Sequence, residues 1–150
     1  MSALPPLPAL PARPVAARLV RYAWAAPCTV MGLVLTAPAF FLGANARVVD
    51  GVIEIAPAGP RAASRLPGFL PFNAITFGHV VFGTSAQELD RLRAHEHAHV
   101  RQYEHWGALF LVAYPASSLW QWARGRRAYA DNRFEVQARA SAGEDPASAT

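Results

Sequence analysis

The sequence predicts an α+β protein, with a few short antiparallel strands, about three helices after them, and one transmembrane helix in front. Three observations lead to this fold class. Runs of β-branched residues broken by turn residues lie before residue 85, whereas helical patterns follow it. No charged side chain occurs between Tyr22 and Ala46. The 150 residues are 53% hydrophobic and only 16% charged, which is more apolar than an average soluble domain.

A long apolar segment dominates the N-terminal third of the chain. Residues 1–21 form a Pro-rich lead that we expect to be disordered. Residues 22–43 are long enough to cross a bilayer as a helix, and they predict a transmembrane anchor. A cleaved signal peptide is an alternative, because Ala44-Asn45-Ala46 has the small-x-small pattern of a cleavage site. A buried core helix is the other alternative, and arginines on both sides of the segment leave its orientation open.

The predicted domain covers residues 47–140, and its first half is predicted to form strands and loops. Asp50-Gly51 between β-branched residues predicts a tight hairpin within Val48–Ile55. Residues 57–71 are rich in proline, glycine and alanine, which predicts a loop. The run Ala74–Phe82 predicts a single strand.

The second half of the domain is predicted to form helices. Ser85 and Glu88 fit a capping box, which predicts a helix over about 86–104 that Gly107 breaks. The apolar stretch 109–122 predicts a helix in the core, on the membrane surface or across the membrane, since it is short for a span. A last helix is predicted over 132–140, followed by a disordered tail over 141–150.

Charge and cysteine content exclude several classes of site. The formal net charge is +4, and every basic residue is an arginine. These arginines do not alternate with aromatic residues, so we expect no nucleic-acid partner. The one cysteine, Cys28, excludes both an intramolecular disulfide and a cysteine-rich zinc site. Any metal must therefore be held by histidines and carboxylates.

Such a set occurs in the predicted helix 86–104. His95 and His99 are four residues apart, which places both imidazoles on one face of a helix, one turn apart. Glu96 lies on the adjoining face, where a carboxylate can accept a proton from metal-bound water. This His-Glu-x-x-His pattern predicts a zinc site that activates water for peptide-bond hydrolysis.

Two residues compete as the third protein ligand. His105 has the spacing of the third histidine in the metzincin pattern, but Gln102 occupies the glycine position of that pattern and no methionine follows the site. Glu135, on the last predicted helix, would complete a set of two histidines and one glutamate, and we favour it. Its alternative interpretations are a capping pair with Asn132 and an exposed salt bridge.

Other polar residues have weaker predicted roles. We expect His97 to be exposed and His79 to make an ordinary hydrogen bond in the strand. A peptide could add to the edge of the strand 74–82. The candidates to orient the ligand histidines are Asp131, Asn132 and Glu104. The candidates to stabilise an oxyanion are Tyr103, Tyr114 and Tyr129.

Three stretches also carry a family resemblance: Ala74–Val81, His95–Gly107 and Tyr129–Ala138. Over about residues 47–140 the chain resembles a group of small bacterial proteins with an N-terminal hydrophobic segment. More broadly, it is similar to a reduced gluzincin, a member of the metallopeptidase clan whose third zinc ligand is a glutamate on a downstream helix. The resemblance implies a minimal zincin-like fold, with His95 and His99 as ligands, Glu96 as general base and Glu135 as third ligand. The chain departs from that clan in lacking a large second lobe.

The sequence therefore predicts a zinc metallopeptidase anchored in the bacterial inner membrane by one helix, or by two if 109–122 also crosses. Its partners would be the membrane and an unidentified peptide or protein substrate. The alternative is a membrane protein that binds metal without catalysis.

Overall fold

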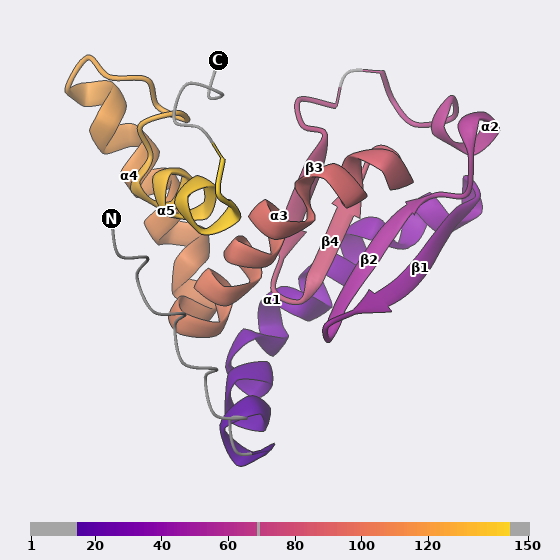
Figure 1. The fold of residues 1–150 in the computed structure, drawn as a ribbon, viewed down its shortest axis with the longest axis horizontal. Helices are drawn as coiled ribbons and strands as arrows, with labels where there is room; N and C mark the ends of the chain where they lie inside the picture. Colours follow the sequence, from indigo (N-terminus) through magenta and orange to yellow (C-terminus); the bar gives the residue numbers. More distant parts are fainter. Residues whose placement is uncertain (1–14, 69, 145–150) are drawn as a thin grey trace, which may run out of the picture.

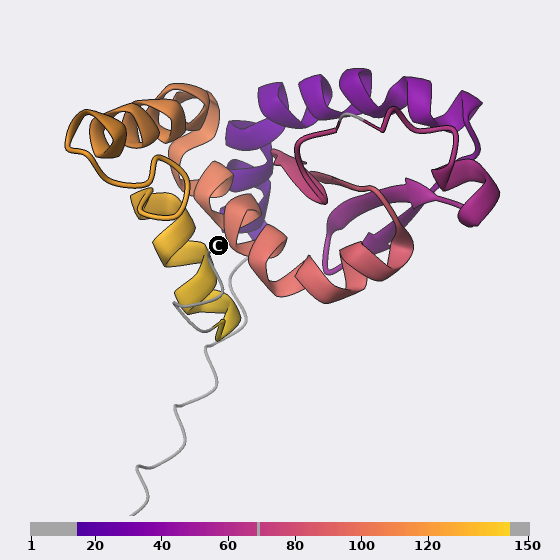
Figure 2. The same ribbon diagram turned by 90° about the horizontal axis from the view of Figure 1, so that it is seen from above.

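The computed structural model describes residues 15–68 and 70–144 and has the predicted α+β class (Figure 1). Its strands form one mixed sheet in the order β1-β2-β4-β3. Helices α1 and α3 cover the two faces of this sheet, as Figure 2 shows. The elements in chain order are α1 (Val15–Phe41), β1 (Ala44–Val49), β2 (Val52–Pro57), α2 (Pro60–Ala63), β3 (Ala74–Phe77), β4 (Val80–Gly83), α3 (Ala86–Trp106), the 3-10 turn η1 (Gly107–Leu109), α4 (Phe110–Ala123) and α5 (Arg133–Ala142).

The first hairpin is confirmed. Strands β1 and β2 pair antiparallel from Ala44 opposite Pro57 to Val49 opposite Val52. The two turn residues between them, Asp50 and Gly51, both have positive φ, at 52° and 82°. This is the backbone that a two-residue hairpin turn needs, and asparagine, aspartate and glycine adopt it most readily.

The prediction of one strand over Ala74–Phe82 is wrong. Residues Gly78 and His79 form a turn, so the run folds into the antiparallel hairpin β3–β4. Gly78 has a φ of 59°, and a Cβ there would lie 2.4 Å from Thr29 Oγ1 on α1, so only glycine fits. The residues on both sides of this turn are mostly apolar, so the sequence pattern does not reveal the turn.

The prediction of an antiparallel sheet is also wrong in one place. Strand β4 pairs parallel with β2, with Ile53 opposite Val80 and Ile55 opposite Phe82. Parallel neighbours require a crossover connection, and the segment 58–73 supplies it. That segment includes the short helix α2 where the sequence predicted only loop.

Helix α1 begins at Val15, so residues 15–21 are helical and not part of a disordered lead. The prediction of disorder for 1–14 lies outside the described residues. At 27 residues α1 is long and apolar enough to cross a membrane, a property that signal sequences and core helices share. One face of α1 is buried: Cys28 packs with Tyr103 and Phe110, whereas Gly32 lies against the β3–β4 hairpin.

Helix α3 starts and ends where its capping residues place it. The Oγ of Ser85 accepts a hydrogen bond of 3.1 Å from the backbone N–H of Glu88. The Glu88 carboxylate pairs with Arg91, at 2.6 Å, and not with the cap. Gly107 has a φ of 56° and ends the helix at Trp106, two residues beyond the predicted end.

Helix α5 extends past its predicted end. Asn132 caps it by accepting a 2.9 Å hydrogen bond from the N–H of Phe134, and Gly143, with a φ of 70°, follows its last residue. Residues 141 and 142 are therefore helical and not part of a disordered tail. Residues 145–150 lie outside the described part of the chain.

A buried carboxylate ties α3 to the sheet. Glu54 on β2 is 1% exposed, and it accepts hydrogen bonds of 2.8 Å from the Nε atoms of both Arg47 and Arg93. The Nε2 of His97 lies 3.3 Å from Glu54 Oε1. The side chain of His97 is only 12% exposed, so the predicted exposure of this histidine is wrong.

The Glu54 cluster predicts acid-sensitive stability. Burial alone would raise the pKa of Glu54, but the hydrogen bonds from Arg93 and Arg47 outweigh it and hold this pKa below its ordinary value. A lowered folded-state pKa stabilises the fold above the unfolded-state pKa of about 4.3, and that contribution is lost as the pH falls through the folded-state pKa.

We therefore expect Glu54→Gln to cost about 1–3 kcal/mol at pH 7, since both arginines are partly exposed and keep some solvation. The variant should also show a flatter fall of stability between about pH 5 and 3 than the wild type. Urea unfolding at several pH values measures both effects. Glu88→Gln is the matched control, because its pair with Arg91 lies at the surface; an equal loss in both variants would contradict the assignment.

Candidate metal centre

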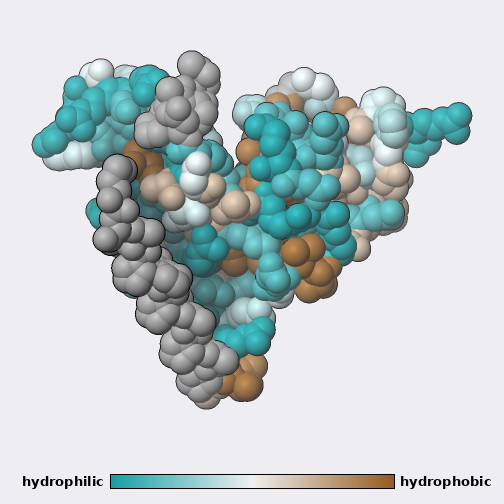
Figure 3. Space-filling view, viewed as in Figure 1, coloured by the Kyte–Doolittle hydropathy of each residue, from teal (hydrophilic) through white to brown (hydrophobic). Residues whose placement is uncertain are grey.

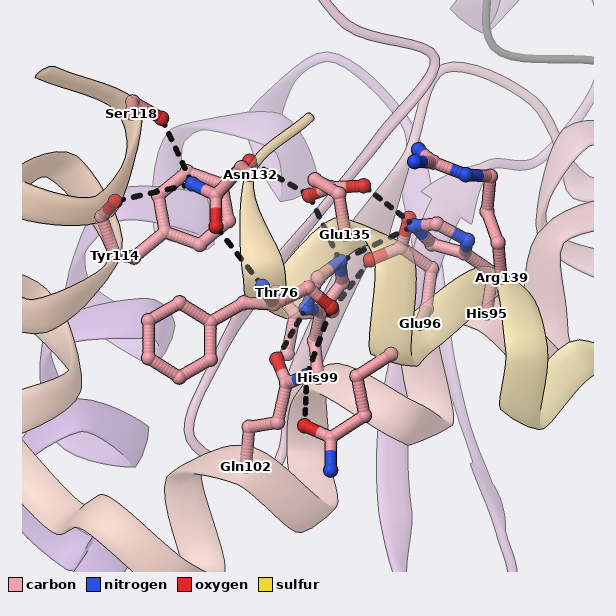
Figure 4. A network of polar contacts seen from close by, with 12 residues as sticks. Thr76, His95, Glu96, His99, Gln102, Tyr114, Ser118, Asn132, Glu135 and Arg139 are labelled. Atoms are coloured by element: carbon pink, nitrogen blue, oxygen red, sulfur yellow. Dashed lines mark hydrogen bonds and ion pairs between the residues drawn. The ribbon is translucent and has the colours of Figure 1, made fainter. Parts of the chain in front are cut away.

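The three predicted ligands lie together between α3 and α5. His95 and His99 are on one face of α3, and Glu135 is in the first turn of α5 (Figure 4). The two Nε2 atoms are 3.1 Å apart. Glu135 Oε2 lies 3.2 Å from His95 Nε2, and its Oε1 lies 3.2 Å from His99 Nε2. All three residues are buried, with exposed fractions of 6%, 8% and 2%.

This geometry fits a tetrahedral metal. Ligand atoms about 2.0–2.1 Å from a tetrahedral zinc are about 3.3 Å from each other, close to the separation of the two Nε2 atoms and to the distance from each histidine to its facing Glu135 oxygen. Two nitrogens and one carboxylate oxygen are also ligand types that zinc accepts in sites with an open position. The Oε2 of Glu135 is buried and makes no regular hydrogen bond within the described residues, although it faces His95 Nε2. A cation at this point would satisfy it.

The electrostatics of the three groups also favour a cation. Burial alone would raise the pKa of Glu135, but His95, His99 and Tyr114 outweigh it and hold this pKa far below its ordinary value. Burial likewise would lower the pKa of His99, but the Glu135 carboxylate raises it. The buried Glu135 carboxylate therefore stays ionised, and a protonated histidine or a bound cation can serve as its positive partner.

Glu96 lies beside the triad, buried at 6% exposure. Its Oε2 accepts a 2.6 Å hydrogen bond from the Oγ1 of Thr76 on β3. This bond fixes the carboxylate at the junction of α3 and the sheet edge. The sequence contains no local pattern that pairs Thr76 with Glu96, because the contact depends on how β3 packs on α3.

The groups beside the candidate ligand histidines differ from those predicted. Gln102 Oε1 lies 2.8 Å from His99 Nδ1, and Gln102 Nε2 donates to the backbone oxygen of Phe134 at 2.9 Å. Glu144 Oε1 lies 3.4 Å from His95 Nδ1. The predicted candidates bond elsewhere: Asp131 with Arg127, Asn132 with α4 and its own helix, and Glu104 with His79 and Arg21.

Helix α4 supports Glu135, the third candidate ligand. The hydroxyl of Tyr114 donates a 2.6 Å hydrogen bond to Glu135 Oε1. Asn132 Nδ2 donates to the backbone oxygen of Tyr114 at 3.0 Å and to the Oγ of Ser118 at 2.8 Å. Asn132 thus caps α5 and attaches it to α4, which places Glu135 opposite the histidines.

The site opens into a cleft of about 970 Å³ between β3, α3, α4 and α5. Figure 3 shows a notch in the same region, between the part formed by α4 and α5 and the part formed by the sheet. The edge strand β3 lines one wall. Tyr129 and Arg139 line the cleft as well, and Figure 4 shows the guanidinium of Arg139 near His95 and Glu135.

Two of these cleft residues can hydrogen-bond or pair with a ligand. Burial, together with the negative charge of Glu135 and a hydrogen bond to it, raises the pKa of Tyr129, so its hydroxyl stays protonated over the physiological range. Arg139 is 8% exposed, donates to the backbone oxygen of Ala130, and has no carboxylate partner among the residues that the structure describes. Tyr103, in contrast, packs in the core with Phe110.

The remaining histidines are outside the cluster. His105 is exposed, with its ring against Trp106, so the metzincin-type ligand is not brought to the site. His79 is in the β3–β4 turn, where its Nε2 lies 3.3 Å from Glu104 Oε1. Among the described residues, His95, His99 and Glu135 form the one group with metal-ligand geometry.

The position of Gln102 predicts a measurable effect on metal affinity. Gln102→Met keeps the side-chain size but removes the acceptor for His99, so we expect zinc affinity to fall about 10- to 100-fold. Competition with a chelating dye measures the change. Gln87→Met, at an exposed position of the same helix, is the control. An unchanged affinity in Gln102→Met would show that His99 needs no such support.

No family model, curated protein or solved structure matches the chain. Function is therefore inferred from the geometry and chemistry of these side chains.

Proposed function

We propose that the protein is a membrane-associated zinc metallopeptidase of the gluzincin type. The observation that carries the proposal is the convergence of His95, His99 and Glu135 on one point in a cleft, with Glu96 beside them. Three protein ligands leave a fourth tetrahedral position for water, as in catalytic zinc sites. Bound zinc would lower the pKa of that water and polarise a carbonyl oxygen.

The chain's own residues supply the other parts of the reaction. Glu96 is the general base that takes a proton from water and returns it to the leaving amine. Thr76 orients Glu96 through its hydrogen bond. Gln102 holds the ring of His99 in place through its hydrogen bond to Nδ1, and the Glu144 carboxylate lies 3.4 Å from Nδ1 of His95.

The cleft suits a peptide in extended form. Strand β3 is the edge of the sheet and lines the cleft beside Glu96, so a substrate could pair with it as an added strand. Tyr129 can donate a hydrogen bond to the oxyanion that forms at the attacked carbonyl. Arg139 offers a positive charge to a carboxylate of the substrate.

Membrane association is supported by α1, which is long and apolar enough to cross a bilayer. The bacterial inner membrane is the proposed location. The experiment that tests the function measures two quantities in the wild type and in Glu96→Gln: the zinc content per chain and the rate at which a mixture of peptides is hydrolysed. Stoichiometric zinc with cleavage that depends on Glu96 would support the proposal, whereas zinc without cleavage would favour metal binding alone.

A further inference from the structure

Helix α1 is part of the packed domain over most of its length. Its buried positions recur every three or four residues and so share one face: Ala25, Cys28, Gly32, Thr36 and Ala39. A Cβ on Gly32 would lie 2.9 Å from the Cβ of Phe77, so the helix and β3 are in close contact. Thr29 Oγ1 accepts a 3.0 Å hydrogen bond from the N–H of His79. These contacts attach α1 firmly to the sheet.

The remaining surface of α1 is apolar and uncovered. Ten large hydrophobic side chains on this helix are exposed, which is far more than a helix on the surface of a soluble domain usually shows. They are Val15, Leu19, Val20, Trp24, Val30, Leu33, Val34, Leu35, Phe40 and Phe41.

Helix α4 has the same character. Phe110 is its only buried residue, although the helix is more apolar than α1. Its exposed apolar side chains are Leu111, Val112, Leu119, Trp120 and Trp122. The later part of α1 and helix α4 lie along the upper edge of Figure 2, opposite α3 and α5; in Figure 1 this part of α1 passes behind the sheet, and α4 lies at the left. The face drawn in Figure 3 is the other side of the molecule, and it is mostly hydrophilic.

The charged side chains that α1 carries are arginines, and further arginines follow α4. Neither α1 nor α4 contains an aspartate or a glutamate. Arg124 and Arg126 are exposed just beyond the C-terminal end of α4, and the Arg124 guanidinium lies 4.3 Å from the ring centre of Trp120. Exposed tryptophans next to arginines are typical of segments at the headgroup level of a membrane that contains anionic lipids.

The packing of α1 conflicts with a crossing helix. A crossing would place α1 through about 30 Å of hydrocarbon and would bring the attached sheet into the same layer. Strand β3 is at the edge of that sheet. Sheet edges exposed to lipid do not occur in the hydrocarbon region, because their backbone N–H and C=O groups would lack partners. An orientation in the plane of the membrane leaves the sheet in water.

We propose that the exposed sides of α1 and α4 form one lipid-binding face, which lies in the plane of the membrane interface on a leaflet with anionic phospholipids. The protein would then be attached to one side of the bilayer, in place of the crossing predicted from the sequence. The proposal goes beyond the peptidase function and does not depend on a bound metal. Because α4 also lines the cleft through Leu111, Tyr114 and Pro115, the cleft would lie next to the membrane surface.

The first test compares the two ends of α1. In a full-length Cys28→Ser background, Arg18→Cys and Asn45→Cys each add one exposed thiol, before and after most of the helix. A membrane-impermeant maleimide is applied to spheroplasts and to inside-out inner-membrane vesicles of the expressing bacterium. Attachment to one leaflet predicts that both thiols react in the same preparation. Reaction of the two thiols in opposite preparations would establish a crossing helix and overturn the proposal.

The second test concerns α4. The full-length protein is floated with vesicles of phosphatidylcholine containing a quarter of anionic phosphatidylglycerol. We expect the double variant Val112→Glu/Trp122→Glu to reduce the bound fraction at least about fivefold. Val136→Glu on α5, which is also an exposed apolar position, should bind as the wild type does. Equal binding by all three proteins, or recovery of the wild type in the soluble fraction, would overturn the proposal. Circular dichroism verifies that each variant is folded.

Discussion

Purified wild-type protein should contain about one zinc per chain, and His99→Ala should contain almost none. His99 supplies one of three ligand atoms that converge within 4.8 Å, and its loss leaves two ligands for the metal. Glu135→Gln should have nearly the same effect, because it removes the anionic carboxylate whose two oxygens face the two histidines, Oε2 toward His95 and Oε1 toward His99. Elemental analysis of the full-length protein in detergent, covering zinc, iron and manganese, measures the content.

His105→Ala is the matched control for His99→Ala. It removes a histidine from the same helix, but His105 is exposed and outside the cluster, so its zinc content should equal that of the wild type. Loss of zinc from His105→Ala would favour the metzincin-type site instead. A wild type that takes up no zinc after reconstitution, or that holds iron, would refute the zinc assignment.

The local parts of the fold were predictable because they depend on residues near one another in the chain. The Asp50-Gly51 hairpin, the Ser85 cap and the helix break at Gly107 each follow from backbone conformations that particular residues favour. The turn at Gly78 and His79 was missed, since it is set by the close approach of α1 and is surrounded by β-forming residues. The parallel pairing of β2 with β4 was missed for a similar reason, because a long connection determines it.

The candidate site, like the fold, has one part that the sequence predicts and another part that it does not. The spacing of His95 and His99 on one helix predicted their proximity, and the structure brings Glu135 to them from a helix 36 residues after His99. The groups around the ligands were not predictable. The packing of β3, α4 and α5 on α3 brings four further residues to the site: Thr76, Gln102, Tyr114 and Glu144. No spacing in the sequence encodes this packing.

Glu96→Gln should separate metal binding from catalysis. Glutamine has nearly the same size, and Glu96 is not among the three ligands, so zinc content should stay near one per chain. An amide cannot accept the proton from water, so the rate of peptide hydrolysis should fall about 10²- to 10⁴-fold. Incubation with a mixture of peptides of diverse sequence, followed by mass spectrometry of the fragments over time, gives this rate even though the physiological substrate is unidentified.

Thr76→Val is the companion variant. It removes the 2.6 Å hydrogen bond to Glu96 but leaves the carboxylate itself, so the rate should fall less than in Glu96→Gln. Zinc content should again be unchanged, because the Thr76 hydroxyl bonds to Glu96 and not to a metal ligand. If Glu96→Gln cleaves the mixture as fast as the wild type, the cleavage does not come from this site. If both variants also lose zinc, Glu96 acts in holding the metal centre together, and its role as general base is wrong.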